Sequence, residues 1–254
     1  MSDDSTDSAT PSTALGRSAI LAYGVISYAI FFVTFLYLIG FIGSGIVPKT
    51  IDSGSAGPAL DAALINLALL GLFAVQHTIM ARPGFKRWWT TIIPIAIERS
   101  TFVLITSLLL SLLVWQWRPM PTVIWNIEGA GFWLLHGISG IGWGIVLLAT
   151  FLIDHFDLFG LRQTWSYATR TPYRGPQFHE RLLYRVCRHP LMLGFLIAFW
   201  FTPTMTVGHL FFAGVSTIYV LVALRIEEAT LIELHGDAYR DYQKRVRMLL
   251  PIPR

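Results

Sequence analysis

The chain has 254 residues, of which 54% are hydrophobic and only 13% are charged. A soluble globular domain usually carries about a quarter charged residues, so this composition excludes an ordinary soluble enzyme. A single formal charge, Asp61, occurs within the five apolar stretches at 18–43, 59–80, 100–117, 132–153 and 190–224. Because charges are missing from whole blocks rather than from one helix face, the sequence predicts an all-α integral membrane protein.

Residues 1–17 precede the first apolar stretch and are rich in Ser, Thr and Asp. They lack apolar periodicity and are predicted to form a disordered tail, which leaves residues 18–254 as a single membrane domain. The first four apolar stretches can each cross a bilayer, because roughly 30 Å of hydrocarbon needs about 20 residues of helix. The fifth contains Pro203, which interrupts a helix, so it predicts a helical hairpin with arms at 190–202 and 207–224.

The basic residues predict an orientation in the membrane. Two loops, at 44–58 and 118–131, hold only Lys49 and Arg118, whereas the two termini and the remaining loops hold the other 17 Lys and Arg residues. The positive-inside rule then predicts that both termini are cytoplasmic, in a bacterial inner membrane. The net charge of +4 is read as this loop bias and not as a nucleic-acid-binding surface. The single cysteine excludes a multi-cysteine metal site, and no metal is expected.

A predicted helix start at Pro190 carries the first cluster of polar residues. Proline suits the first turn of a helix, where its missing N–H costs little, and the residue before it is extended. Arg188 and His189 would therefore stand beside free backbone amides at a helix N-terminus, which is a site for an anion. A charged flank at the membrane boundary is the structural alternative for these two residues.

A second polar cluster follows the predicted hairpin. Glu227 and Glu228 are adjacent carboxylates whose mutual repulsion grows with desolvation, so the pair favours a function over a purely structural role. Tyr239 and Tyr242 share one helix face further along the chain. An amphipathic helix at the membrane interface is the structural alternative for these tyrosines, and taken alone they favour it.

In chain order these elements resemble a family signature. The Arg-His-Pro sequence at 188–190, the hairpin, the glutamate pair and the two tyrosines resemble the membrane methyltransferases typified by isoprenylcysteine carboxyl methyltransferase. The resemblance implies a cytoplasmic helical segment, within about 154–254, that binds S-adenosylmethionine and releases S-adenosylhomocysteine. The cofactor-binding residues that it implies are Tyr184, Arg188, His189, Pro190, Leu191, Leu193, Gly194, Glu227, Glu228, Tyr239 and Tyr242.

Other segments narrow the resemblance to a subgroup. The sequences at 76–82, 98–100 and 154–163 look like those of the bacterial methanethiol S-methyltransferases, which share an ancestry with a denitrification-associated family of membrane proteins. The resemblance implies methylation of a small thiol, methanethiol, to dimethyl sulfide, with hydrogen sulfide as a second candidate substrate. Met192 departs from the wider family, in which Tyr is common after His-Pro. The oligomeric state stays open.

Methyl transfer to a thiol is an in-line displacement, in which positioning and charge placement supply most of the rate. Small thiols are mostly protonated at neutral pH, since even the Cys thiol has a pKa of about 8.5, so a nearby base would raise the reactive fraction. His77 and Arg82, near the cytoplasmic end of the second apolar stretch, are the first candidates for catalytic residues. Asp154 and His155, at the matching end of the fourth stretch, are the next.

Two other classes of protein stay open at this stage. Membrane reductases and isomerases with the same hairpin use a nicotinamide cofactor. A non-enzymatic haem-binding protein could use pairs among His77, His136 and His155, although His77 and His136 are predicted at opposite depths. A melting-temperature shift with S-adenosylhomocysteine or with a nicotinamide cofactor would separate the enzymes, and a Soret band would identify haem.

Overall fold

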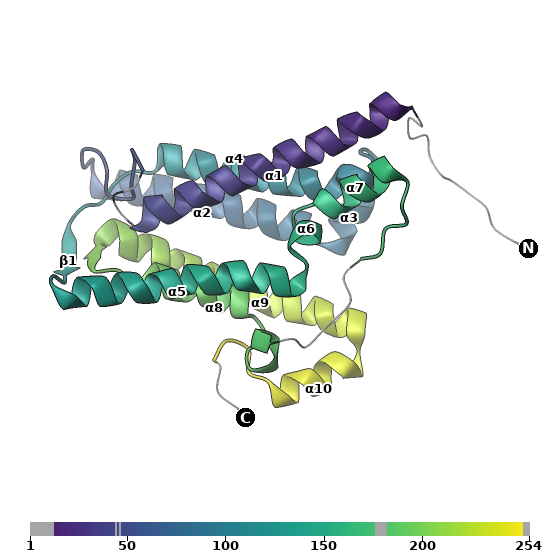
Figure 1. Ribbon diagram of the computed structural model, residues 1–254. Coiled ribbons are helices and arrows are strands. Elements are labelled where there is room, and N and C mark those ends of the chain that lie inside the picture. Colours follow the sequence, from purple (N-terminus) through teal and green to yellow (C-terminus); the bar gives the residue numbers. More distant parts are fainter. Residues whose placement is uncertain (1–12, 44, 46, 176–181, 251–254) are drawn as a thin grey trace, which may run out of the picture.

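The computed structural model describes residues 13–43, 45, 47–175 and 182–250, which form a bundle of helices (Figure 1). Five helices in this part of the chain are long and apolar enough to cross a membrane, namely α1 (Ala14–Gly43), α2 (Ala59–Met80), α4 (Ile95–Gln116), α5 (Ala130–Ile153) and α9 (Val207–His235). The shorter apolar helix α8 (Pro190–Trp200) forms the predicted hairpin with α9. The prediction of an all-α integral membrane protein is therefore confirmed.

Several helices extend beyond the apolar stretches of the sequence. Helix α1 begins at Ala14, inside the segment predicted as a disordered tail, while residues 1–12 of that segment lie outside the described residues. Helix α9 continues to His235, so Glu227 and Glu228 lie within a long helix and not in a loop. Each backbone N–H of a helix bonds the carbonyl four residues earlier whether the side chains are polar or apolar, so a helix need not end with its apolar sequence.

Two glycines bring α5 and α8 into close contact. A Cβ atom built on Gly142 would lie 2.7 Å from the carbonyl oxygen of Gly194, and one built on Gly194 would lie 2.7 Å from the carbonyl oxygen of Gly142. Small residues allow helix backbones to approach each other in this way inside membranes. Gly194, expected from the resemblance among the cofactor-binding residues, thus has a packing role that any side chain would disrupt.

Strands and apolar packing close one end of the bundle. The strands β1 (Val123–Asn126) and β2 (Thr204–Thr206) pair there in antiparallel fashion, and the second of them lies in the turn of the hairpin (Figure 1). The largest buried cluster includes Phe41, Trp117 and Phe212. We call this the strand end of the bundle.

The opposite end, where α1 begins and α9 ends, carries most of the charged residues, and we call it the charged end. Its short helices are α3 (Pro83–Trp89), α6 (His155–Leu158), α7 (Leu161–Thr169), the 3₁₀ helix η1 (Leu182–Arg185) and α10 (Asp237–Arg245). The chain reverses at Gly236, whose φ of +56° favours glycine, and α10 then turns back beside α9 (Figure 1). This return places the C-terminal segment next to the start of α8.

Candidate functional site

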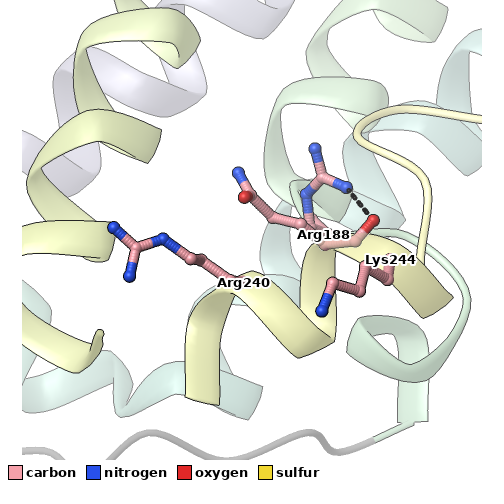
Figure 2. A pocket seen from close by; sticks show the side chains of 4 residues that line it. Arg188, Arg240 and Lys244 are labelled. Carbon is pink, nitrogen blue, oxygen red and sulfur yellow. Dashed lines mark hydrogen bonds between the residues drawn. The ribbon is translucent and has the colours of Figure 1, made fainter. Parts of the chain in front are cut away.

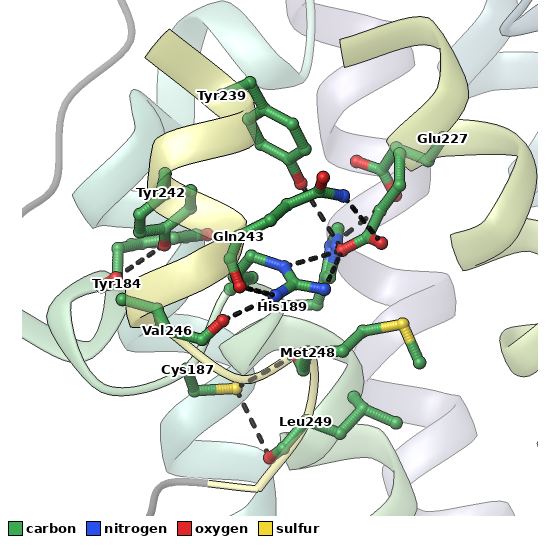
Figure 3. Close-up of polar contacts among 12 residues, drawn as sticks. Tyr184, Cys187, His189, Glu227, Tyr239, Tyr242, Gln243, Val246, Met248 and Leu249 are labelled. Carbon is green, nitrogen blue, oxygen red and sulfur yellow. Dashed lines mark hydrogen bonds and ion pairs between the residues drawn. The ribbon is translucent and has the colours of Figure 1, made fainter. Parts of the chain in front are cut away.

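The carboxylate of Glu228 on α9 is the centre of a polar network that joins this helix to the start of α8 and to α10. His189, Tyr239 and Gln243, which contact it, are labelled in Figure 3. Its Oε1 lies 2.7 Å from Nε and 2.6 Å from Nη2 of Arg188. The Arg188 side chain is only 6% exposed and that of Glu228 only 10%. Loss of either partner would leave a buried charge without its counter-charge, which makes this pair important for stability.

Three further side chains complete what we call the Glu228 network. His189 places Nε2 3.2 Å from Oε1 of the glutamate, and the Tyr239 hydroxyl donates to the same oxygen at 3.5 Å. Gln243 donates from Nε2 to Oε2 at 3.1 Å. Burial and the nearby glutamate charge raise the pKa of the Tyr239 phenol, which keeps it a hydrogen-bond donor. Both oxygens of Glu228 are thus occupied by protein groups.

The neighbouring Glu227 has a different environment. Its side chain is 46% exposed, and its Oε2 lies 3.8 Å from Nδ1 of His189, beyond hydrogen-bond distance. Successive helical residues project about 100° apart, so one helix buries Glu228 and presents Glu227 at its surface. Glu227 is therefore the member of the pair whose carboxylate is open to a ligand.

The start of α8 is occupied by the returning chain. The backbone amides of Arg188 and His189, which directly precede this helix, donate to the carbonyls of Arg247 and Met248 at 3.0 and 3.1 Å. Nη1 of Arg188 also donates to the carbonyl of Gln243 at 3.2 Å. The C-terminal segment thus folds back as a parallel neighbour, and an anion site at the first turn of α8 stays a prediction.

Other predicted cofactor-binding residues lie in the packing around this network. Tyr242 is buried, and its hydroxyl donates to the carbonyl of Tyr184 in η1. Pro190 begins α8 as predicted, and Leu191 and Leu193 on its first turns are partly buried. The contact between Tyr242 and Tyr184 joins α10 to η1. The cofactor role of all these residues stays a prediction.

Cys187 lies under the returning segment. It is 2% exposed, and its thiol donates to the carbonyls of Met248 and Leu249 at 3.5 and 3.4 Å. Burial raises the pKa of this thiol. A buried thiol with a raised pKa is a poor nucleophile, which agrees with a packing role.

His77 lies in an aromatic cluster between α2, α4 and α9. Its ring stacks on Phe73 with centroids 5.3 Å apart and contacts Phe102 at 5.0 Å. The Arg99 guanidinium lies 4.8 Å from the Phe102 centroid. Nδ1 of His77 is buried and has no hydrogen-bond partner among the described residues. Since buried polar atoms are nearly always paired, this nitrogen is available for a ligand.

Arg82 and Tyr219 connect the His77 cluster to α9. Nη1 of Arg82 donates to Thr230 Oγ1 at 3.1 Å and to the carbonyl of Ile226 at 3.4 Å, one residue before Glu227. The Tyr219 hydroxyl lies 3.4 Å from Thr78 Oγ1, and its ring meets Phe73 edge-on at 5.9 Å. The structure therefore brings the His77 cluster and the open carboxylate to the same helix, α9.

Asp154 and His155 occupy a different place. Nδ1 of His155 lies 2.8 Å from Thr150 Oγ1 and Nε2 lies 2.9 Å from the Tyr28 hydroxyl, so both ring nitrogens are engaged. Asp154 accepts from the backbone amide of Asp157 and pairs with Arg162. These contacts anchor α6 against α1, α5 and α7, and they favour a structural role for both residues over the predicted catalytic one.

Two residues of this region, Gln243 and Tyr219, were not predicted from the sequence as site residues. Gln243 stands four residues after Tyr239, so helical spacing alone places both on the face of α10 that meets Glu228. Tyr219 had no such signal, because a tyrosine in an apolar stretch is also a common packing residue and its neighbour Thr78 lies 141 residues away in sequence.

The fold and the site together define an all-α integral membrane protein whose polar groups gather where the C-terminal hairpin meets the returning segment. The chain is 54% identical over 235 residues to methanethiol S-methyltransferase 2 of Bradyrhizobium diazoefficiens. This alignment covers 92% of the chain and 91% of that protein. It is 53% identical over 238 residues to methanethiol S-methyltransferase of Mycobacterium tuberculosis, covering 93% and 98% respectively. The chain belongs to the methanethiol S-methyltransferase family, and it is a membrane methyltransferase.

A more distant similarity extends to an animal membrane protein. Nurim of Sus scrofa is 27% identical over 187 residues, or 69% of this chain and 70% of that protein. This agrees with the predicted membership of a wider membrane superfamily. No protein-family model matches the chain, and no solved structure matches it.

Proposed function

We propose that this protein transfers a methyl group from S-adenosylmethionine to a small thiol, converting methanethiol to dimethyl sulfide and, as a second reaction, hydrogen sulfide to methanethiol. The names of its relatives support methanethiol as the methyl acceptor. The observation that carries the proposal is that α9 carries an open carboxylate, Glu227, and also packs beside His77, whose buried Nδ1 has no hydrogen-bond partner among the described residues. The positive-inside distribution supports a site at the cytoplasmic face of a bacterial inner membrane with both termini inside.

The residues around α9 fit S-adenosylmethionine by their chemistry. Its methionine ammonium and ribose hydroxyls are donors, and an exposed carboxylate such as Glu227 accepts from them. The charged groups of Arg188 and Glu228 already bond to each other and to neighbouring protein groups, so we assign both as positioning residues. They hold His189 and the start of α8 against Glu227. When bound, S-adenosylmethionine supplies an electrophilic methyl group on a cationic sulfur.

His77 is the group proposed to act on the acceptor. As the bond between the thiol sulfur and the methyl carbon forms, the carbon–sulfonium bond breaks and the thiol proton passes to Nδ1 of His77. The products are a neutral thioether, neutral S-adenosylhomocysteine and a protonated imidazole that returns its proton to water. Phe73 and Phe102 hold the ring from two sides, which fixes the direction of the nitrogen.

The two alternative classes receive less support. A haem held by His155 would have to break hydrogen bonds at both of its ring nitrogens, to Thr150 and Tyr28. No contact among the described residues favours a nicotinamide cofactor over S-adenosylmethionine. The thiol methyltransferase is therefore the function that the geometry supports best.

The test uses full-length protein purified in detergent or nanodiscs. With S-adenosylmethionine and methanethiol we expect dimethyl sulfide in the headspace, and with hydrogen sulfide we expect methanethiol followed by dimethyl sulfide. S-adenosylhomocysteine should raise the melting temperature by mass action. Folded protein that forms no volatile product and shows no such shift would overturn the proposal, and a shift with a nicotinamide cofactor alone would favour the reductase alternative.

A further inference from the structure

A basic surface lies on α10 and on the segment that follows it. We define this basic surface by four exposed residues, Arg240, Lys244, Arg245 and Arg247. Across residues 240–250 the only acidic residue is Asp241. The surface therefore has a clear excess of positive charge, on the last helix of the described chain.

Part of this surface is hollowed. A depression of about 380 Å³ is lined by Arg188, Arg240, Gln243 and Lys244 (Figure 2). Arg240 and Lys244 each pair with an aspartate on their own helix, at 2.9 and 2.8 Å, and these ion pairs are highly exposed. Exposed pairs of this kind contribute little to stability, so both cations can turn toward an anion at little cost. The depression thus has two exposed cations on its rim, Arg240 and Lys244, that can bind an anion such as a phosphate group.

Exposed apolar side chains adjoin the same segment. Leu234 near the end of α9 and Leu250 beyond α10 are both exposed, as is Val186 next to η1. Val186 adjoins Cys187, which pairs with Arg247, so this apolar residue lies beside the basic surface. Basic residues combined with exposed leucine and valine are typical of elements that lie in a membrane interface.

The fold places this combination at the boundary of the membrane. Helix α9 is a candidate membrane span, and α10 begins directly after Gly236 and turns back beside it (Figure 1). Arg188 stands two residues before the first residue of the apolar helix α8. The basic surface therefore follows the candidate span α9 directly, and Arg188, at the start of the apolar helix α8, lines its depression, which brings the surface within reach of lipid headgroups.

We propose that the basic surface binds the anionic headgroups of the surrounding membrane, and that the depression takes the phosphate of one lipid. Charge complementarity selects the occupant, because each basic residue near an anionic membrane adds to the attraction. Arg188 and Gln243 line the depression and also belong to the Glu228 network. A headgroup in the depression therefore stabilises α10 in its docked position and makes the stability of the folded protein depend on anionic lipid.

The experiment compares full-length protein in nanodiscs of phosphatidylcholine with protein in an equimolar mixture of phosphatidylcholine and phosphatidylglycerol. We expect a melting temperature that is higher by a few degrees in the anionic nanodiscs. The double variant Arg240→Gln/Lys244→Gln should lose at least half of this rise. The control variant Arg87→Gln/Arg174→Gln removes two exposed charges from other elements and should keep the rise.

Three outcomes would overturn the proposal. Anionic lipid that gives no rise excludes a headgroup site, and equal losses in the two double variants indicate a general surface potential instead. A rise produced by inorganic phosphate in phosphatidylcholine nanodiscs would assign the depression to a soluble anion. If the double variant fails to fold, the charge-conserving Arg240→Lys/Lys244→Arg should fold and keep the rise. All of these melting temperatures are measured without methyl donor or thiol, so they are independent of the test of methyl transfer.

Discussion

The Glu228 network and the aromatic cluster around His77 both include residues of α9, and they are built in opposite ways. In the first, both carboxylate oxygens of Glu228 are filled by protein donors from α8 and α10. In the second, a buried nitrogen of His77 is left without a partner among the described residues, between aromatic rings. A saturated network resists movement, whereas an unpaired nitrogen can accept a proton from a ligand. The comparison separates residues that hold the site in place from residues that act in it.

The largest effect is expected on the stability of the protein when the Glu228 network is disrupted. Glu228→Ala leaves the Arg188 guanidinium buried without its counter-charge, which should lower the free energy of unfolding by about 3–5 kcal/mol. The measurement is denaturant or thermal unfolding in detergent. The double variant Arg188→Met/Glu228→Leu should recover much of the stability while methyl transfer stays low. A Glu228→Ala protein as stable as the wild type would show that the network does not hold the three helices together.

A substitution in the His77 cluster should change the rate of methyl transfer and not the stability of the protein. His77→Ala removes the proposed base and should lower kcat by about 10²–10⁴, with the melting temperature little changed. Dimethyl sulfide formation is the measurement, and His136→Ala, near the strand end, is the matched histidine control. Unchanged kcat in His77→Ala would remove this residue from the mechanism and leave the thiol to ionise without it.

The two adjacent glutamates should differ from each other. Glu227→Gln removes a charge that is open to the cofactor, which should weaken S-adenosylhomocysteine or S-adenosylmethionine binding by about tenfold, as expected for one hydrogen bond to a charged group. Folding should be unaffected because the side chain is half exposed. Binding is followed by calorimetry, with Glu233→Gln, an exposed glutamate on the same helix, as control. Equal binding by both variants would contradict the assignment of Glu227.

A smaller effect is expected where the His77 cluster meets α9. Tyr219→Phe removes the hydroxyl that meets Thr78 but keeps the ring against Phe73. We expect a change in kcat/KM for the thiol of about two- to tenfold, the range of one neutral hydrogen bond. The variant Thr78→Val should reproduce it. A change confined to the KM for S-adenosylmethionine would move Tyr219 to the donor side of the site.

The reactivity of the Cys187 thiol tests whether the C-terminal segment detaches from the start of α8. Burial raises the pKa of its thiol, so the folded protein holds less thiolate than the unfolded chain at every pH up to the raised pKa. The resulting stability is present below the unfolded pKa and is lost as the pH rises through the folded value. A thiol reagent should therefore react much more slowly with native than with denatured protein, and Cys187→Ala should leave the rate of methyl transfer within about twofold. Fast labelling of the native protein would show that the returning segment detaches.

Most of the fold could be predicted from the pattern of charge. Blocks of apolar sequence as long as a bilayer is thick permit few structures besides helices, and Pro203 divides the last block into a hairpin. The ends of the helices could not be predicted in this way. Helix α9 continues eleven residues past its apolar stretch because Glu228 and its neighbours are paired by other elements.

For the candidate site, the types of residue could be predicted from the sequence: the Arg188-His189-Pro190 helix start, the glutamate pair and an intramembrane histidine. The role that each one can take depends on its contacts in the folded chain. Both ring nitrogens of His155 have hydrogen-bond partners, whereas Nδ1 of His77 has none within the described part of the chain, and Glu228 is buried while Glu227 is exposed. The physical reason is that pairing and burial depend on groups brought together from distant parts of the chain. Local spacing fixes only which side chains share a helix face.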